Sequence, residues 1–149
     1  MERFIGNIDA KADVKGRVFV PAVFRKTLQT AGETHLVLRK DIFQNCLILY
    51  PASVWNNELS ELRGKLNKWD EEQQQIFRQF SLEVEIVEID TNGRILIPKK
   101  YMQLAKIEAD VRFVGLDYTI EIWNKDILEK GTFSPAAFKE NVKKHLGSK

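Results

Sequence analysis

The sequence predicts a β-rich α+β fold built from two copies of one small unit. Residues 13–21 recur as residues 90–98, with Asp, Gly, Arg and Pro at matching places and three apolar residues in a row between Arg and Pro. Short apolar runs bounded by turn residues predict strands and hairpins in both copies. A helical pattern of apolar residues separates the copies, so we expect a repeat with a helical linker.

Each copy is expected to begin with two strands joined by a tight turn. Asn92-Gly93 is a strong hairpin signal because both residue types tolerate positive φ, and Lys15-Gly16 holds the same place in the first copy. Val84, Ile86 and the nearby Ile89 alternate with glutamates, which predicts a strand.

A short helix is predicted after each second strand. Pro21 and Pro98 suit the first helical position, where a missing N–H costs nothing. Gly32 is the expected C-terminal cap of the first helix. The side chains expected to face the core are Val23, Phe24 and Leu28 in the first copy and Tyr101, Met102 and Ala105 in the second. Closing hairpins follow, from residues 36–38 and 47–50 and from residues 111–114 and 120–123, with a longer loop in the first.

The middle of the chain predicts two helices with a break near Trp69. Apolar residues from Trp55 to Phe80 recur in steps of three and four, and residues 70–73 resemble a capping box. Such a long apolar stripe packs either on the core or on another subunit. The expected organisation is copy one at residues 7–54, a helical linker at 55–82, copy two at 83–126 and a C-terminal helix or tail at 127–149.

Composition favours a cytoplasmic protein. The start lacks the apolar stretch of a signal peptide, and no apolar run approaches the roughly 20 residues that span a bilayer. The single cysteine, Cys46, lies among apolar residues and is expected to be a buried thiol. Net charge is only +2, but residues 1–55 carry 8 basic against 5 acidic residues and residues 81–128 carry 6 against 9. This asymmetry suits a binding face or head-to-tail contact between subunits.

The doubled Asp-x-x-Gly-Arg-apolar-x-apolar-Pro motif resembles the MraZ family of bacterial regulators, whose members carry two AbrB-like (SpoVT-AbrB) units in one chain. The likeness covers nearly the whole chain, although Asn92 stands in copy two where copy one has Lys15. It implies a swapped-hairpin β-barrel, a pseudo-dimer of the two units with peripheral helices. It further implies a nucleoid-associated, ring-shaped homo-oligomer on directly repeated DNA boxes upstream of the division and cell-wall gene cluster.

The arginines of the two motifs are the candidate DNA-reading residues. Arginine presents a planar fork that matches guanine or phosphate, and a two-stranded ribbon fits a major groove. With the resemblance, the expected DNA-binding residues are Lys11, Lys15, Arg17, Arg25, Asn92 and Arg94. The residues expected to hold the turns are Asp13, Gly16, Asp90 and Gly93. Local pairing of Asp with Arg that merely holds each turn stays open.

Other functions are less well supported by the residues. His35 and His145 lie far apart, and no catalytic, nucleotide-binding or metal-ligand motif accompanies them. We therefore expect neither an enzyme nor a cofactor, metal, membrane or small-molecule substrate. The alternative is an AbrB-like, antitoxin-type module that binds a protein partner without promoter specificity of its own.

Overall fold

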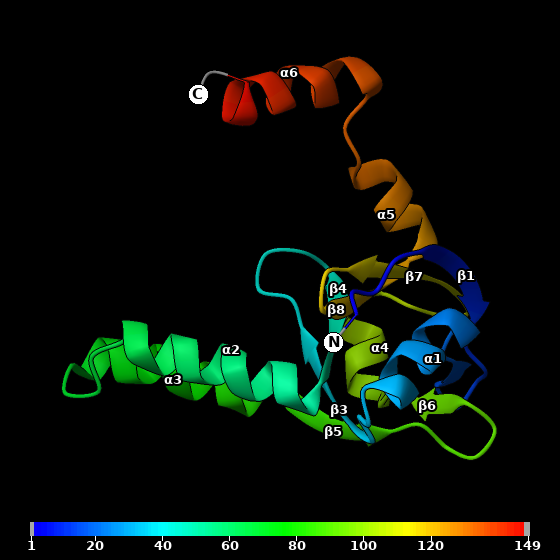
Figure 1. Ribbon diagram of the computed structural model, residues 1–149, viewed down its shortest axis with the longest axis horizontal. Coiled ribbons are helices and arrows are strands. Elements are labelled where there is room, and N and C mark those ends of the chain that lie inside the picture. The colour runs from blue at the N-terminus through cyan, green and yellow to red at the C-terminus, as the bar shows by residue number, and fades with distance from the viewer. Residues whose placement is uncertain (1, 148–149) are drawn as a thin grey trace.

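The computed structural model describes residues 2–147 as a mixed α+β fold with two antiparallel sheets (Figure 1). The six-stranded sheet has the order β1-β7-β8-β4-β3-β5, and β2 pairs with β6 in a separate two-stranded ribbon. The strands are β1 (Asn7–Lys11), β2 (Arg17–Phe19), β3 (His35–Lys40), β4 (Cys46–Pro51), β5 (Val84–Glu88), β6 (Arg94–Leu96), β7 (Asp110–Leu116) and β8 (Thr119–Asn124). The helices are α1 (Ala22–Thr30), α2 (Ala52–Lys65), α3 (Glu71–Leu82), α4 (Lys99–Leu104), α5 (Lys125–Gly131) and α6 (Pro135–Leu146).

The two copies are interleaved rather than laid side by side. Strand β1 of copy one pairs with β7 of copy two, β3 pairs with β5, and β4 pairs with β8. The ribbon joins β2 of copy one to β6 of copy two. Each copy thus completes the sheet of the other, and the repeat seen in the sequence is one structural body.

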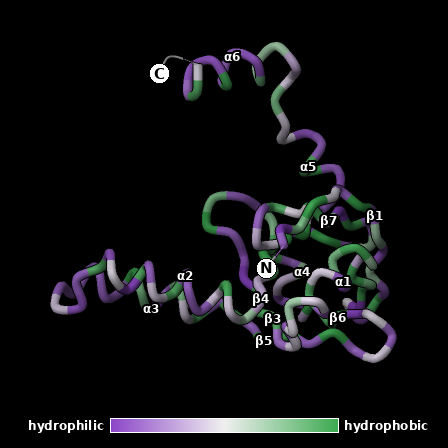
Figure 2. The backbone as a smooth tube through the Cα atoms, in the orientation of Figure 1, coloured by the Kyte–Doolittle hydropathy of each residue, from purple (hydrophilic) through white to green (hydrophobic). Residues whose placement is uncertain are grey.

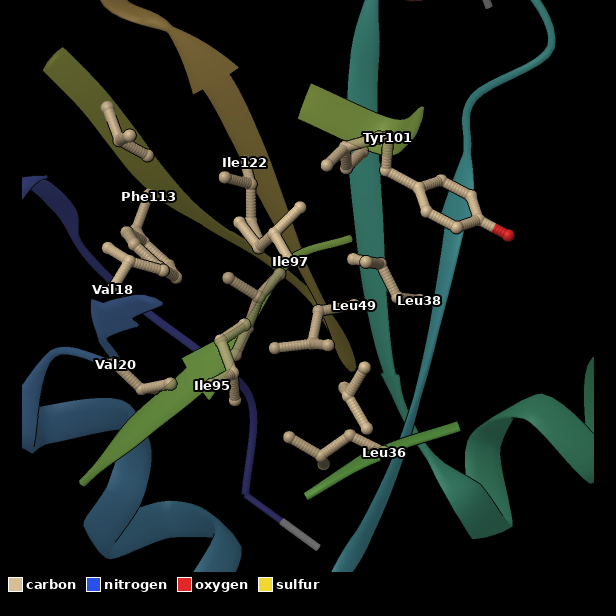
Figure 3. Close-up of a cluster of buried hydrophobic side chains, with 14 of the residues drawn as sticks. Val18, Val20, Leu36, Leu38, Leu49, Ile95, Ile97, Tyr101, Phe113 and Ile122 are labelled. Atoms are coloured by element: carbon tan, nitrogen blue, oxygen red, sulfur yellow. The ribbon is translucent and has the colours of Figure 1, made fainter. Parts of the chain in front are cut away.

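The core lies between the six-stranded sheet and the ribbon. Val18 and Val20 from one copy and Ile95 and Ile97 from the other are at most 1% exposed. Figure 3 shows these side chains gathered with those of Leu36, Leu49, Phe113 and Ile122 from the larger sheet. Their burial fixes which face of the ribbon points outward, because successive side chains of a strand point to opposite faces.

Helices α1 and α4 follow the ribbon strands as the sequence predicts. Phe24 and Leu28 are buried on α1, and Gly32 follows the helix with φ of +69°. The expectation was wrong at Val23, which is exposed because the buried stripe of α1 runs through Phe24 and Leu28. The prolines lie one position earlier than expected, at the N-caps of the two helices.

In α4 the expected side chains Tyr101 and Met102 are buried, as is Ala105 at its C-cap. The closing hairpins β3–β4 and β7–β8 form as predicted, with the longer loop in copy one.

Strand β5 forms where the alternation of apolar residues with glutamates predicts a strand. Val87 is the buried side chain of this strand, whereas Ile86 is exposed. The alternation with glutamates therefore locates the strand but does not identify its buried side chain. Since β5 is the last strand of its sheet, Ile86 lies at an edge that no described strand covers.

Helices α2 and α3 form a hairpin that projects from the sheets (Figure 1). The break falls before Asp70, whose carboxylate accepts a 2.9 Å hydrogen bond from the Gln73 backbone N–H, as the capping pattern predicts. Only the base of the hairpin packs on the sheet, where Trp55 is buried against Tyr50. At the tip Trp69 is 87% exposed, so the apolar stripe is not core along its whole length.

Arg39 supports the base of this hairpin from β3. Its side chain is buried, and its guanidinium lies 5.3 to 5.9 Å from the ring centres of Tyr50, Trp55 and Phe80. It also donates a 2.8 Å hydrogen bond to the Tyr50 hydroxyl. Stacking of arginine on aromatic faces stabilises the junction between hairpin and sheet.

Helices α5 and α6 lead away from the sheets, and α6 stands apart from the body in Figure 1 and Figure 2. Ser134 caps α6 by accepting a hydrogen bond from the Ala137 N–H, with Pro135 at the first helical position, as the sequence predicts. The last residues of the expected C-terminal segment, 148–149, lie outside the described residues. None of the described helices is both long and apolar enough to cross a membrane.

Candidate nucleic-acid interface

The first motif folds into a turn organised by the Asp13 carboxylate. One carboxylate oxygen accepts hydrogen bonds from the backbone N–H groups of Lys15 and Arg17, both at 2.9 Å. The other accepts a 2.7 Å bond from Arg17 Nε. Gly16 closes the turn with φ of +91°, a value that L-residues other than glycine rarely adopt. Asp13 therefore both holds the turn and orients the arginine.

The second motif repeats this network atom for atom. Asp90 accepts 2.9 Å bonds from the N–H groups of Asn92 and Arg94, and a 3.1 Å bond from Arg94 Nε. Gly93 has φ of +89°. The local Asp–Arg pairing that the sequence leaves open is present in both turns, and it engages only Nε of each arginine.

Both turn carboxylates are held in the charged form. The backbone hydrogen bond from Arg17, reinforced by its side chain, lowers the pKa of Asp13 below the ordinary value of 3.8. The backbone hydrogen bond from Arg94 lowers the pKa of Asp90 in the same way. At neutral pH both carboxylates are therefore ionised acceptors, which suits a structural role better than contact with phosphate.

The two turns are tied to one another through the ribbon. The Gly16 carbonyl accepts a 2.9 Å bond from Ile97 N–H, and the Gly93 carbonyl accepts a 3.0 Å bond from Val20 N–H. Each turn is thus hydrogen-bonded to the residue that follows the ribbon strand of the other copy. Because the contacts are reciprocal, the turns have a fixed spacing and a two-fold-like relation.

We use the name ribbon face for the outward side chains of β2 and β6, which are Arg17, Phe19, Arg94 and Leu96. In the register, Arg17 lies opposite Leu96 and Phe19 lies opposite Arg94. Arg17 and Arg94 side chains are 39% and 26% exposed, so neither arginine is buried in the core. The Arg94 guanidinium lies 5.9 Å from the centre of the Phe19 ring.

Sequence reasoning missed Phe19 and Leu96, which are both more than half exposed. They belong to the apolar triplets that follow each arginine, and a run of three apolar residues predicts a strand without distinguishing its outward side chain from its inward ones. The available signal is strand alternation: residues two positions after an outward arginine share its face.

The other candidate basic residues surround the ribbon unevenly. Lys15 is exposed at the tip of the first turn, and Asn92 holds the same place in the second. Arg25 reaches from α1 to the second turn, where its Nη1 donates a 3.4 Å bond to the Gly93 carbonyl. Lys11 lies at the end of β1 and forms a 3.6 Å ion pair with Asp110, which partly balances its charge.

No group of three or more His, Cys, Asp or Glu side chains within residues 2–147 could hold a metal ion. His35 Nε2 lies 2.9 Å from a carboxylate oxygen of Glu88, and both side chains are exposed. Cys46 is fully buried, as predicted, and burial raises the pKa of its thiol to about 12, which keeps it protonated and unreactive at neutral pH.

Comparison with known proteins matches both halves of the chain to one family model, described as "MraZ protein, putative antitoxin-like", over residues 4–78 and 80–137. The chain is 56% identical over 146 residues to the transcriptional regulator MraZ of Phocaeicola vulgatus, covering 98% of this chain and 95% of the relative. It is 59% identical over 138 residues to the transcriptional regulator MraZ of Bacteroides thetaiotaomicron, covering 93% of this chain and 88% of the relative. It is 38% identical to that of Thermoanaerobacter sp., covering 95% of each.

Proposed function

Since the chain belongs to the MraZ family of transcriptional regulators, we propose that it reads double-stranded DNA with the ribbon face and the two turns that flank it. The observation that carries the proposal is the pair of arginines, each oriented by its own aspartate on one exposed two-stranded ribbon. A two-stranded β-ribbon has the width that a major groove admits. The chain is a regulator and not an enzyme, in keeping with its family.

The aspartates do not engage the two terminal nitrogens of either arginine. Asp13 and Asp90 engage Nε, while Nη1 and Nη2 of both arginines find no acceptor among residues 2–147. Two terminal nitrogens held in one plane match O6 and N7 of guanine, or two phosphate oxygens. A fixed Nε also reduces the conformational entropy lost on binding.

The apolar members of the ribbon face add a second kind of contact. Phe19 and Leu96 project beside the arginines, and apolar side chains contact the methyl group of thymine in the major groove. Lys15, Lys11 and Arg25 are suited to phosphates on either side, and Asn92 to an adenine edge or a phosphate. The ribbon face thus supplies base contacts and its surroundings supply positioning contacts.

Assembly on repeated sites completes the proposal. We propose that the two units, at residues 7–54 and 83–126, form a swapped-hairpin barrel, with the linker at 55–82 and the segment from 127 outside it. Ring-shaped homo-oligomers of this pseudo-dimer would bind directly repeated boxes in the promoter of the division and cell-wall gene cluster, within the nucleoid. Several modest contacts on one assembly gain affinity through avidity.

The first prediction tests the two arginines. Arg17→Ala and Arg94→Ala should each weaken binding to a repeated promoter box by roughly 5- to 150-fold, because a bidentate base contact is worth about 1–3 kcal/mol. Arg17→Lys should lose most of the same affinity, since it keeps the charge without the fork. Fluorescence anisotropy with labelled duplexes measures the affinities, and circular dichroism checks folding.

Arg78→Ala is the matched control, because this exposed arginine lies on α3 outside the ribbon face. It should bind as the wild type does. Unchanged affinity in both ribbon variants, with a stoichiometric protein partner that co-purifies, would instead favour the antitoxin-type alternative.

A further inference from the structure

The two turns are surrounded by different basic residues although their backbones match. Lys15 at the tip of the first turn corresponds to Asn92 in the second, so only the first turn carries a lysine. The second turn instead receives a basic side chain from helix α1 of copy one, through Arg25. The residue of α4 that corresponds to Arg25 is Met102, which is buried and uncharged. The two-fold-like relation of the turns therefore does not extend to the charged groups around them.

Arg25 lies directly against the second turn. Its Nη1 donates a 3.4 Å hydrogen bond to the Gly93 carbonyl, and its guanidinium occupies the space that a Cβ on Gly93 would need. At Gly16 the nearest atoms to an added Cβ are backbone atoms of Ile97 instead. Gly93 thus has a second role besides its positive φ, because the missing side chain leaves room for Arg25 against the backbone.

Arg25 retains two adjacent donors that no described residue accepts. Its guanidinium forms no ion pair within residues 2–147, and its Nε and Nη2 have no acceptor there. Such a pair of neighbouring N–H groups matches O6 and N7 of guanine. At the first turn, Lys15 offers a point charge on a flexible side chain in place of a planar fork.

The ribbon face differs between its two ends in the same sense. Arg94 lies opposite Phe19, 5.9 Å from the centre of its ring, whereas Arg17 lies opposite Leu96, which has no ring. Stacking on an aromatic ring restricts a guanidinium. The end of the ribbon at the second turn therefore carries two constrained guanidiniums, those of Arg94 and Arg25.

We infer that Arg25 is a specificity-determining residue that adds a base contact beside that of Arg94 and so sets the direction in which the chain lies on DNA. An operator mirrors the symmetry of the protein that reads it, so two equivalent turns would read a palindrome. With Arg25 at one turn only, the half of the box under the second turn requires a guanine that the other half does not. The inference rests on the proposed DNA-reading function and assigns the source of its direction.

Selection of bound sequences from a random DNA pool, with the full-length protein, tests the inference. The wild type should give a motif that differs from its own reverse complement. Arg94→Ala and Arg25→Met should relax the base preference in one half of this motif, and Arg17→Ala in the other half. At the position read by Arg25, the preference for guanine should fall by roughly 5- to 150-fold, because a bidentate contact is lost.

Two further variants separate base reading from folding and from charge. Arg25→Lys keeps the charge without the fork and should relax the same half of the motif, which preserves the test if Arg25→Met does not fold. Lys26→Met removes a charge from the next, exposed position of α1 and should leave the motif unchanged. Circular dichroism checks the fold of every variant.

A palindromic wild-type motif would overturn the inference, as would an unchanged motif in the folded variants of Arg25. Uniform weakening across all sequences, with a salt slope reduced by about one, would mean that Arg25 contacts only a phosphate, and the inference would fail. In each of these cases the proposed function still stands if Arg17→Ala and Arg94→Ala relax the motif. If neither of these two variants relaxes it, DNA reading by the ribbon face fails as well.

Discussion

Gly16 and Gly93 hold equivalent backbone conformations in unlike surroundings. A Cβ on Gly16 would collide with the Ile97 carbonyl, which is fixed in the ribbon. A Cβ on Gly93 would collide with the end of the Arg25 side chain, which can move away. The two turns therefore share a need for positive φ but differ in how much space they leave.

Alanine at each position should expose this difference. Both variants should lose roughly 1–3 kcal/mol of unfolding free energy from backbone strain, and Gly16→Ala should lose more because a backbone atom blocks it. Gly93→Ala should in addition displace Arg25 and weaken its contact at the second turn. Urea titration followed by tryptophan fluorescence measures both losses.

Gly64→Ala is the control, since Gly64 lies within α2 with no atom within 4 Å of an added Cβ. It should gain about 0.5–1 kcal/mol through helix propensity. Equal stability of all three variants would contradict the strain argument.

At the residue scale, the sequence predicts the turns well because their chemistry is local. The spacing of Asp13 and Arg17 suffices to anticipate a turn closed by their pairing. Strand alternation puts Phe19 and Leu96 on the same face as Arg17 and Arg94, but a three-residue strand is too short to show by its own pattern which of its two faces is exposed.

At the scale of elements, the hairpin of α2 and α3 depends on a cap at its bend. Asp70 is the only residue of that bend whose side chain accepts from the first turn of α3 among the described hydrogen bonds. The carboxylate also lies at the positive end of the helix dipole.

Asp70→Ala should therefore lower the stability of α3 by about 1 kcal/mol. Hydrogen exchange of the α3 amides measures the loss, because it reports the local opening of single elements. Glu61→Ala, an exposed change inside α2, should leave that exchange unchanged. Faster exchange in both variants would show that the bend is not held by this cap.

Helices and strands were predictable where the repeat of apolar residues extends over many positions, and less so where it covers only a few. The helical stripe from Trp55 to Phe80 gave two helices and their break. The buried faces of β5 and α1 do not follow from such short patterns. Val87 rather than Ile86 is buried in β5, because this strand is set by its pairing with β3 of the other copy. Val23 is exposed because the buried stripe of α1 runs through Phe24 and Leu28.

At the scale of the whole molecule, interleaving makes the two copies one folding unit. Strands β4 and β8 come from different copies and pair directly, with Leu47 opposite Ile122. Neither copy can keep its core side chains buried if the other unfolds. Doubling of a motif does not reveal this exchange of strands, and only the family resemblance pointed to it.

We therefore expect one cooperative transition for the sheets. In native-state hydrogen exchange, the slowest amides of β4 and β8 should give the same opening free energy, equal to that from denaturant unfolding. Distinct opening energies for the two strands would show that the copies unfold independently.

Having both turns in a single polypeptide has an evolutionary consequence. In a homodimer of single-unit chains, every mutation of a turn appears twice, so the two turns must stay identical. Here each turn is encoded separately, and the two turns differ in sequence. When the two copies are aligned, Lys15 corresponds to Asn92 and Arg25 corresponds to Met102. Natural selection can thus change the side chains of one turn without changing the other, while the common core preserves the spacing of the two turns.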